Sequence, residues 1–170
     1  MGLLRNRDDV PGGRRFQMRE KLASIGDDSW IEDESGDRVY KVDGKAMRLR
    51  DTFILKDMHG DEVAKIQEKK VAIRDTMKIE RGGDTIATVH KRLVGMRDRF
   101  DIEIEGGQDM KARGNFVEHE YEIKRDDDVV ASVSRKWFRV RDTYGVEIAT
   151  GVDEPLILAI TVALDEMTRV

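Results

Sequence analysis

The sequence reads Leu156-Ile157-Leu158-Ala159-Ile160-Thr161-Val162-Ala163-Leu164 near its C-terminus, and this stretch decides the fold. Asp153 is a candidate N-cap, and Glu154 and Pro155 suit the first turn of a helix. The apolar residues cover every side of that helix, so it is either buried on all sides or placed in lipid. A helix that spans a bilayer needs about 20 apolar residues, whereas Asp165 ends this run early. We therefore predict a helix that the rest of the chain encloses.

An internal repeat precedes the helix, with spacings of 23, 24, 23, 21 and 23 residues between its anchors. The anchors are Asp28, Asp51, Asp75, Asp98, the degenerate copy His119, and Asp142. Two residues after the anchors stand Trp30, Phe53, Met77, Phe100, Tyr121 and Tyr144, and two before the last five stand Leu49, Ile73, Met96, Val117 and Val140. Apolar residues at every second position are typical of half-buried strands.

Turn signals separate the repeats, and they predict hairpins. These signals include Gly36-Asp37, Gly60-Asp61, Gly82-Gly83 and Gly106-Gly107, which suit turns with positive φ. Each repeat then holds two antiparallel strands, so six repeats give about twelve strands. Side chains alone fill a barrel of about eight strands, whereas a wider barrel has room for a helix about 10–12 Å across.

We therefore predict a mainly β fold, a closed antiparallel barrel of about twelve strands around a central buried C-terminal α-helix. The small residues Ala64, Ala87 and Ala131 recur at matching positions and suit close approach to that helix. The alternative is a two-sheet sandwich with the helix outside, but an outside helix would carry a polar face. We expect residues 1–15 to form a flexible tail and residues 16–170 to form the barrel domain.

Several short motifs resemble the LURP-one-related family, from about Phe16 to the C-terminus. They are Met18-Arg19-Glu20-Lys21-Leu22, Ser24-Ile25-Gly26-Asp27-Asp28, Val42-Asp43-Gly44-Lys45-Ala46, Leu49-Arg50-Asp51-Thr52, Ile66-Gln67-Glu68-Lys69-Lys70 and Arg135-Lys136-Trp137-Phe138. The family belongs to the tubby C-terminal-like superfamily, which also contains the phospholipid scramblases. This resemblance implies a twelve-stranded barrel around a central helix. Tubby domains bind phosphoinositides, but no functional residue is carried over, because their lipid-binding motif has no match here.

Composition limits the function classes. The net charge of −4 and the pI near 5.5 argue against a nucleic-acid binder, since such domains are usually basic. The absence of cysteine excludes disulfides, cysteine-ligated zinc and a thiol nucleophile, and it suits a reducing compartment. Without an apolar N-terminal run typical of a signal peptide, we expect a cytoplasmic monomer that has no transmembrane segment and associates with membranes, if at all, at their surface.

Cations recur at two positions of the repeat, which suggests a basic barrel end. Six residues before the anchors stand Lys45, Lys69, Arg92, Arg113 and Lys136, and one residue before the anchors stand Arg50, Arg74, Arg97 and Arg141. If the strands pair as predicted, these nine residues gather at one end, and acidic turns occupy the other. The nine are candidate ligands for anionic lipid headgroups or other phosphorylated molecules. The alternative is that each arginine pairs with a neighbouring aspartate and that the cations protect strand ends.

Other chemical signals are weak, and we predict no catalytic residue, metal site or cofactor. His59, His90 and His119 lack metal-ligand spacing, and His119 is expected to be structural. The run 126–128 of three aspartates is either a loose cation site or, as we favour, a solvated turn. Trp137-Phe138 either inserts at the headgroup level of a membrane or is part of the barrel wall. Asp165 is expected to pair with an arginine of the barrel end and so to latch the helix.

These observations favour a non-enzymatic binding or scaffold protein of the LURP-one-related type that recognises anionic phospholipid through its basic end. A protein-interaction module in stress or defence signalling, without lipid binding, is the alternative. An enzyme with an active site at a barrel mouth is a third, weaker reading.

Overall fold

The computed structural model describes residues 13–20, 28–43, 52–71, 74–94, 97–138 and 140–168 of the chain. At 69–71, 74–75, 93–94 and 97–98 it describes the backbone alone. The predicted site residues Lys45 and Arg50 lie outside the described residues, as does the greater part, 1–12, of the expected tail. Strand β1 begins at Arg14, so the barrel starts two residues inside that tail.

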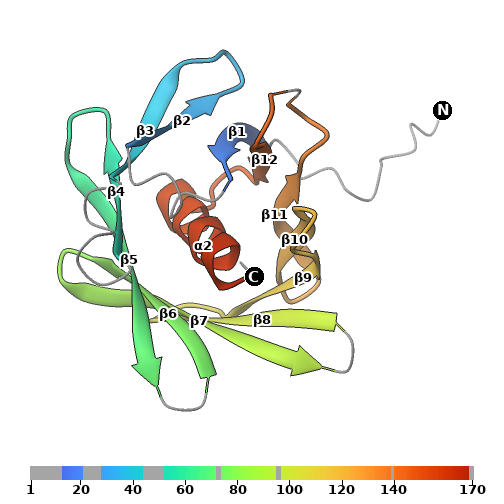
Figure 1. The fold of residues 1–170 in the computed structure, drawn as a ribbon. Coiled ribbons are helices and arrows are strands. Elements are labelled where there is room, and N and C mark those ends of the chain that lie inside the picture. The colour runs from blue at the N-terminus through green and yellow to red at the C-terminus, as the bar shows by residue number, and fades with distance from the viewer. Residues whose placement is uncertain are drawn as a thin grey trace.

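Twelve strands form a closed antiparallel barrel (Figure 1). In chain order they are β1 (Arg14–Arg19), β2 (Ser29–Asp33), β3 (Arg38–Asp43), β4 (Thr52–Asp57), β5 (Glu62–Val71), β6 (Arg74–Arg81), β7 (Asp84–Val94), β8 (Arg97–Ile104), β9 (Met110–Asn115), β10 (Glu120–Arg125), β11 (Asp128–Ser134) and β12 (Thr143–Ile148). Each strand pairs with its neighbours in sequence, and β1 pairs with β12 to close the ring. The predicted barrel is confirmed.

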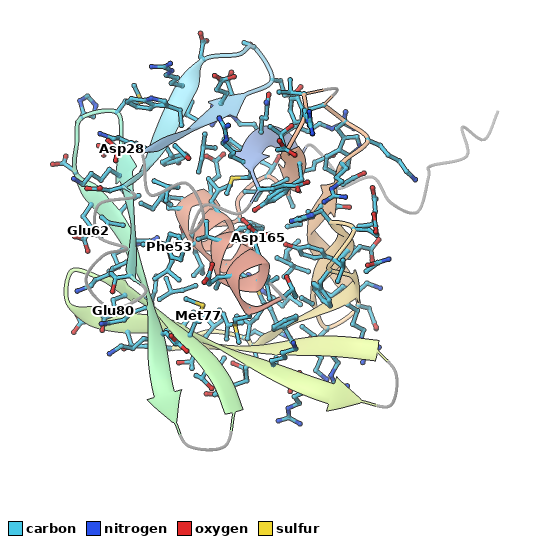
Figure 2. The ribbon with its side chains drawn as sticks, in the orientation of Figure 1. Asp28, Phe53, Glu62, Met77, Glu80 and Asp165 are labelled. Carbon is cyan, nitrogen blue, oxygen red and sulfur yellow. The ribbon has the colours of Figure 1, made fainter. Side chains whose placement is uncertain are left out.

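Alternate residues of each strand face the interior, which explains the period-two pattern of the sequence. Phe53 and Met77 point toward the middle of the barrel, while Glu62 and Glu80 lie on its outside (Figure 2). The residues four after the last five anchors are also buried, namely Leu55, Ile79, Ile102, Ile123 and Val146. A single apolar core therefore fills the space between the wall and the central helix.

Helix α2 (Glu154–Met167) fills the barrel. Every residue from Leu156 to Leu164 is buried, as the all-round apolar pattern predicts. Asp153 caps the helix, since its carboxylate accepts a hydrogen bond from the Leu156 N–H at 3.2 Å. The one polar side chain of the buried run, Thr161, donates to the Leu158 carbonyl at 2.7 Å and so leaves no unsatisfied donor.

The helix runs from one end of the barrel to the other and lies closest to β5, β6, β7 and β12. Two of the alanines that the sequence analysis singled out, Ala64 on β5 and Ala87 on β7, are fully buried on this side. A small side chain at these positions lets the helix approach the wall closely.

Among the described residues, three apolar positions of the repeat do not face the core, contrary to the strand pattern. Trp30 is on the outer face of β2, where the guanidinium of Arg38 lies 4.6 Å from its ring centroid. Val117 and Val140 are 61% and 56% exposed. Both lie in connections between strands, because the chain turns before the strand begins, so alternation does not apply to them.

Candidate functional site

The barrel has two unlike ends, which the strand connections define. We call the end with the turns β2–β3, β4–β5, β6–β7, β8–β9 and β10–β11 the turn end, and the other the loop end. Helix α2 starts at the turn end after β12 and finishes at the loop end. The five anchors that the structure describes, all but Asp51, lie at the loop end or in the first residues of the strands that leave it.

The predicted site residues divide into three groups by their place in the barrel. The backbones of Lys69, Arg74 and Arg97 lie where β5, β6 and β8 meet the loop end. Arg141 lies in the connection between β11 and β12, and its side chain is 94% exposed. The remaining described members, Arg92, Arg113 and Lys136, lie on or beside the outer wall, so the structure does not bring all nine into one site.

A row of arginines crosses the outer wall near the loop end. Arg92 on β7 is registered opposite Arg99 on β8, and Arg99 opposite Arg113 on β9. Asp101 forms ion pairs with the first two of them, and at Arg92, the one of these two that was a predicted site residue, this agrees with the alternative that the arginines pair with neighbouring aspartates. Arg113 has no ion-pair or hydrogen-bond partner among the described residues.

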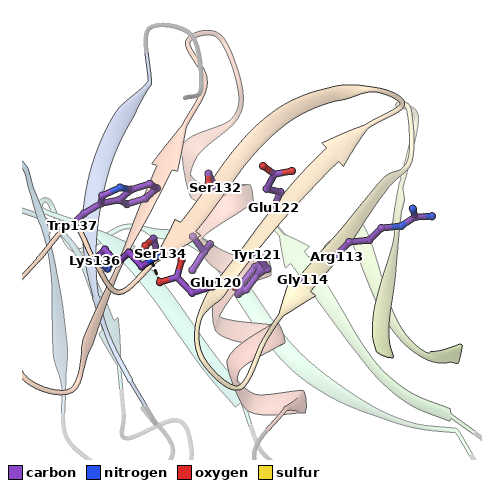
Figure 3. Close-up of a pocket in the computed structure, with 10 residues that line it drawn as sticks. Arg113, Gly114, Glu120, Tyr121, Glu122, Ser132, Ser134, Lys136 and Trp137 are labelled. Atoms are coloured by element: carbon purple, nitrogen blue, oxygen red, sulfur yellow. Dashed lines mark hydrogen bonds between the residues drawn. The ribbon is translucent and has the colours of Figure 1, made fainter. Parts of the chain in front are cut away.

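Next to this row, the outer wall of β9, β10 and β11 carries a groove of about 510 Å³. Arg113 lies at one side and Lys136 with Trp137 at the other (Figure 3). Glu120, Glu122 and Ser132 line the wall between them. The groove is therefore polar, with a cation on each flank.

Hydrogen bonds fix the floor of the groove near Lys136. Glu120 Oε1 accepts from Ser134 Oγ at 2.9 Å and from the Arg135 N–H at 3.2 Å. The Lys136 N–H in turn donates to Ser134 Oγ at 3.1 Å. These bonds hold the start of the β11–β12 connection against the wall, so the backbone that carries Lys136 is positioned before any ligand arrives.

Trp137 and Phe138 pack against the barrel wall and do not protrude from it. This supports the interpretation of the pair as part of the wall. A Cβ at Gly145, on the outer face of β12, would lie 2.7 Å from Trp137 Cε3 and 3.0 Å from Phe138 Cε2. The guanidinium of Arg15 lies 4.7 Å from the Trp137 ring centroid. Glycine at 145 thus makes room for the connection to fold back over the wall.

Behind the groove, inside the barrel, lies a buried cluster of ionisable side chains. His119 Nε2 is 2.8 Å from Asp165 Oδ1, and His119 Nδ1 is 3.8 Å from Glu20 Oε1. Glu20 also accepts a hydrogen bond from Arg135 Nε at 2.6 Å. Burial and then the charge of Asp165 raise the pKa of the Tyr121 and Tyr144 phenols well above 10. The burial of His119 agrees with the structural role expected of it, and the partner of Asp165 is this histidine where an arginine was predicted.

Several carboxylates of the turn end stabilise its turns. Asp33 Oδ1 accepts from the N–H groups of Ser35 and Asp37, which is the ordinary role of aspartate in a turn. Asp57 does the same one hairpin later, with the N–H groups of His59 and Asp61. The acidity of this end therefore has a structural cause.

Two ion pairs fasten the start of α2 to the wall at the turn end. Arg81 donates from both terminal nitrogens to Asp153, at 2.8 and 3.1 Å, and Arg14 Nη1 lies 3.3 Å from Glu154. Burial by itself would raise the pKa of Asp153, but Arg81 and the Leu156 N–H lower it below its usual value. Burial and then Glu154 raise the pKa of Tyr40 to about 12.

No group of three or more potential metal ligands occurs among the described side chains. The run 126–128 is exposed in the turn between β10 and β11. Within the described part of the chain, no helix combines the length and the apolar character that crossing a bilayer requires.

Comparison with known proteins places this barrel in a family. The model of the LURP-one-related family matches residues 14–165, so the chain belongs to that family. An X-ray structure of a protein from Arabidopsis thaliana has the same fold, with a TM-score of 0.71 and 22% sequence identity over 95% of each chain. No curated protein sequence matches this chain significantly.

Sequence reasoning located the basic positions but not the groove. Arg113 and Lys136 are 23 residues apart in the chain, and the fold-back of the β11–β12 connection decides that they flank one surface. The glycine at 145 was the available signal, since a strand interior seldom carries glycine unless another group approaches closely.

Proposed function

We propose that this protein is a non-enzymatic binding module whose loop end recognises an anionic membrane surface. The observation that carries the proposal is the exposure of two valines, Val117 and Val140, at the same end as the fully exposed Arg141. An ion pair of 3.4 Å between Arg135 and Glu118 ties the two connections that carry these valines to one another. Apolar and basic groups thus share one tip of the barrel.

Membrane association at this tip would combine two weak contributions. Each lysine or arginine near an anionic bilayer contributes about 1 kcal/mol of attraction, which salt screens. Each buried CH₂ group adds about 0.8 kcal/mol. The basic residues or the apolar residues alone would give only marginal membrane binding. We therefore expect binding that is reversible and that needs both kinds of residue. The backbone positions of Lys69, Arg74 and Arg97 add three more basic residues near the same end.

Resemblance to the tubby C-terminal-like superfamily, which includes the phospholipid scramblases, agrees with this proposal. We propose binding at the membrane surface and no movement of lipid across the bilayer.

Co-sedimentation with phosphatidylglycerol-containing vesicles, at low and high salt, tests the proposal. We expect binding at low salt that falls with added salt, that Arg141→Glu weakens, and that the double variant Val117→Asp/Val140→Asp abolishes. Met58→Asp is the matched control, because Met58 is a 51% exposed apolar residue at the opposite, turn end. Absence of binding at low salt, or an equal loss with Met58→Asp, would exclude a membrane-facing loop end.

Protein interaction without lipid binding is the second candidate function. The polar groove on the outer wall favours it, because a groove with fixed hydrogen-bonding groups suits a specific partner better than a fluid surface.

A further inference from the structure

We propose that the groove on β9, β10 and β11 binds an extended acidic segment of a partner protein. Carboxylates of that segment would meet Arg113 on one flank and Lys136 on the other. Its backbone N–H groups would donate to the acceptors of the floor, Glu122 and Ser132. This site differs from the membrane-facing tip and does not depend on it.

The two flanking cations are available to a ligand. Neither the Arg113 guanidinium nor the Lys136 ammonium has a hydrogen bond or ion pair with any described residue. Both side chains are exposed. Most other cations of the described wall are engaged, for example Arg15 with Glu147 at 2.8 Å and Lys56 with Asp43 at 3.2 Å. Lys111 on β9 also lacks such a partner among the described residues, but it lies outside the groove, whereas Arg113 and Lys136 both line it.

The arginine row adds to the attraction for anions. Like charges registered directly opposite one another on neighbouring strands destabilise a sheet, and Arg99 stands between Arg92 on one side and Arg113 on the other. Asp101 forms ion pairs with the first two arginines, while Arg113, whose register neighbour on β10 is Glu122, forms none within 4.0 Å among the described residues. An acidic ligand at Arg113 would relieve this repulsion.

The carboxylates of the groove restrict which anion fits. Glu122 has only a loose ion pair with Lys124, at 3.7 Å, and Glu120 lies beside it in the groove. A uniformly negative surface such as a bilayer or a nucleic acid would bring phosphates against both carboxylates. A single phosphate could not meet both flanks, since they are two strand spacings apart, about 10 Å. A peptide offers negative side chains at its ends and N–H donors between them, which matches the order of groups on the wall.

The geometry also sets the length of the segment. The distance across the wall from β11, beside Lys136, to Arg92 on β7 is four strand spacings of about 4.8 Å, or roughly 19 Å. An extended chain covers about 3.3 Å per residue, so about six residues would reach from Lys136 across Arg113 to the arginine row.

Fluorescence anisotropy with a labelled peptide of about eight alternating glutamate and serine residues tests this site on the full chain. We expect Arg113→Gln and Lys136→Gln each to weaken binding about tenfold, because each removes a hydrogen-bonded charge from the complex. Lys111→Gln is the matched control: Lys111 is an exposed lysine on the outer face of the same strand, two residues from Arg113 and outside the groove. It should change the affinity less than twofold.

Three results would overturn the proposal. They are no binding at about 1 mM protein, an equal effect of Lys111→Gln, and equal binding of a peptide in which glutamine replaces glutamate. Val117→Asp/Val140→Asp separates the two proposals, because it should abolish vesicle binding and leave peptide binding unchanged. If that variant loses the peptide while its melting temperature is unchanged, the peptide binds at the loop end and the groove assignment is wrong.

Discussion

The His119 ring bridges the turn before β10 and the last turn of α2, with its Nε2 atom 2.8 Å from Asp165 Oδ1. The ring also stacks on Tyr144, with centroids 4.4 Å apart. A carboxylate near a helix C-terminus is unfavourable with the helix dipole, so Asp165 gains from a hydrogen-bonding partner in the wall. A second wall contact acts at the same end, where Lys91 Nζ lies 3.5 Å from the Met167 carbonyl oxygen. These contacts hold the end of the central helix in place.

Replacing either member of this pair should destabilise the barrel. We expect His119→Ala to lower the free energy of unfolding by about 1–3 kcal/mol, because a largely buried carboxylate loses a hydrogen bond. Asp165→Ala should also lower the melting temperature. The two effects should be less than additive in the double variant, since the second substitution removes a group that has already lost its partner. Urea denaturation of the four proteins measures the coupling, and strictly additive losses would mean that the contact contributes nothing.

Gly145 should tolerate no side chain while Trp137 is present. A Cβ there would lie 2.7 Å from Trp137 Cε3, so we expect Gly145→Ala to destabilise the protein by about 1–3 kcal/mol through overpacking. The substitution should also change the tryptophan fluorescence as the connection shifts. In a Trp137→Ala background the same substitution should cost less than in the wild type, because only the contact with Phe138, at 3.0 Å, remains. A stable Gly145→Ala protein with unchanged emission would contradict this packing.

The sequence predicted the fold because the strands and the helix each carry a strong local pattern. Phe53 and Ile79 follow the two-residue period and face the core, and the apolar run of the helix is buried on all sides. The same pattern misled us at Val117 and Val140. Alternation identifies residues that are apolar at even spacing, but it does not identify where a strand begins.

The candidate site was less predictable, because it depends on contacts between distant residues. His119 and Asp165 are 46 residues apart, and no periodicity relates them. The nine basic positions were found by counting from the anchors. Which of them form ion pairs could not be found in this way. Asp101 forms an ion pair with Arg92, whereas Arg113 has no ion pair among the described residues, and only the register of β7, β8 and β9 distinguishes the two.

The tyrosines should make the fold sensitive to alkaline pH. The pKa of Tyr40 is raised to about 12, and those of Tyr121 and Tyr144 are raised well above 10, chiefly by burial. An unfolded tyrosine titrates near 10, so above that pH the folded state binds more protons than the unfolded state. Stability should therefore fall as pH rises from about 10 to 12, by at most about 1.4 kcal/mol per pH unit for each tyrosine.

Two measurements check this alkaline sensitivity. Phenolate absorbance of the folded protein should stay near zero at pH 10, although free tyrosine would be half ionised there. Tyr40→Phe should reduce the loss of stability between pH 10 and 12, because it removes one of the three tyrosines whose pKa is raised. A normal phenolate signal at pH 10, in protein that still resists urea, would contradict the burial of these side chains.

At the turn end, the Asp153 carboxylate serves as both helix cap and ion-pair partner, and substitutions can separate these roles. Asp153→Ala removes the hydrogen bond to the Leu156 N–H and the Arg81 pair, and should cost about 1–2 kcal/mol. Asp153→Ser keeps a capping oxygen and loses only the pair, which at 39% exposure of both side chains contributes at most about 1 kcal/mol. Urea denaturation at neutral pH should therefore rank the alanine variant below the serine variant.

Acid should abolish the ion-pair part of this difference. Because the pKa of Asp153 is lowered in the folded state, its charge stabilises the barrel above the unfolded value near 3.8 and loses that effect as pH falls below it. The stability difference between the wild type and Arg81→Ala should accordingly shrink between pH 7 and pH 3. A difference that is the same at both values would show that Arg81 acts through its hydrogen bond to the Val63 carbonyl, at 3.0 Å, and not through its charge.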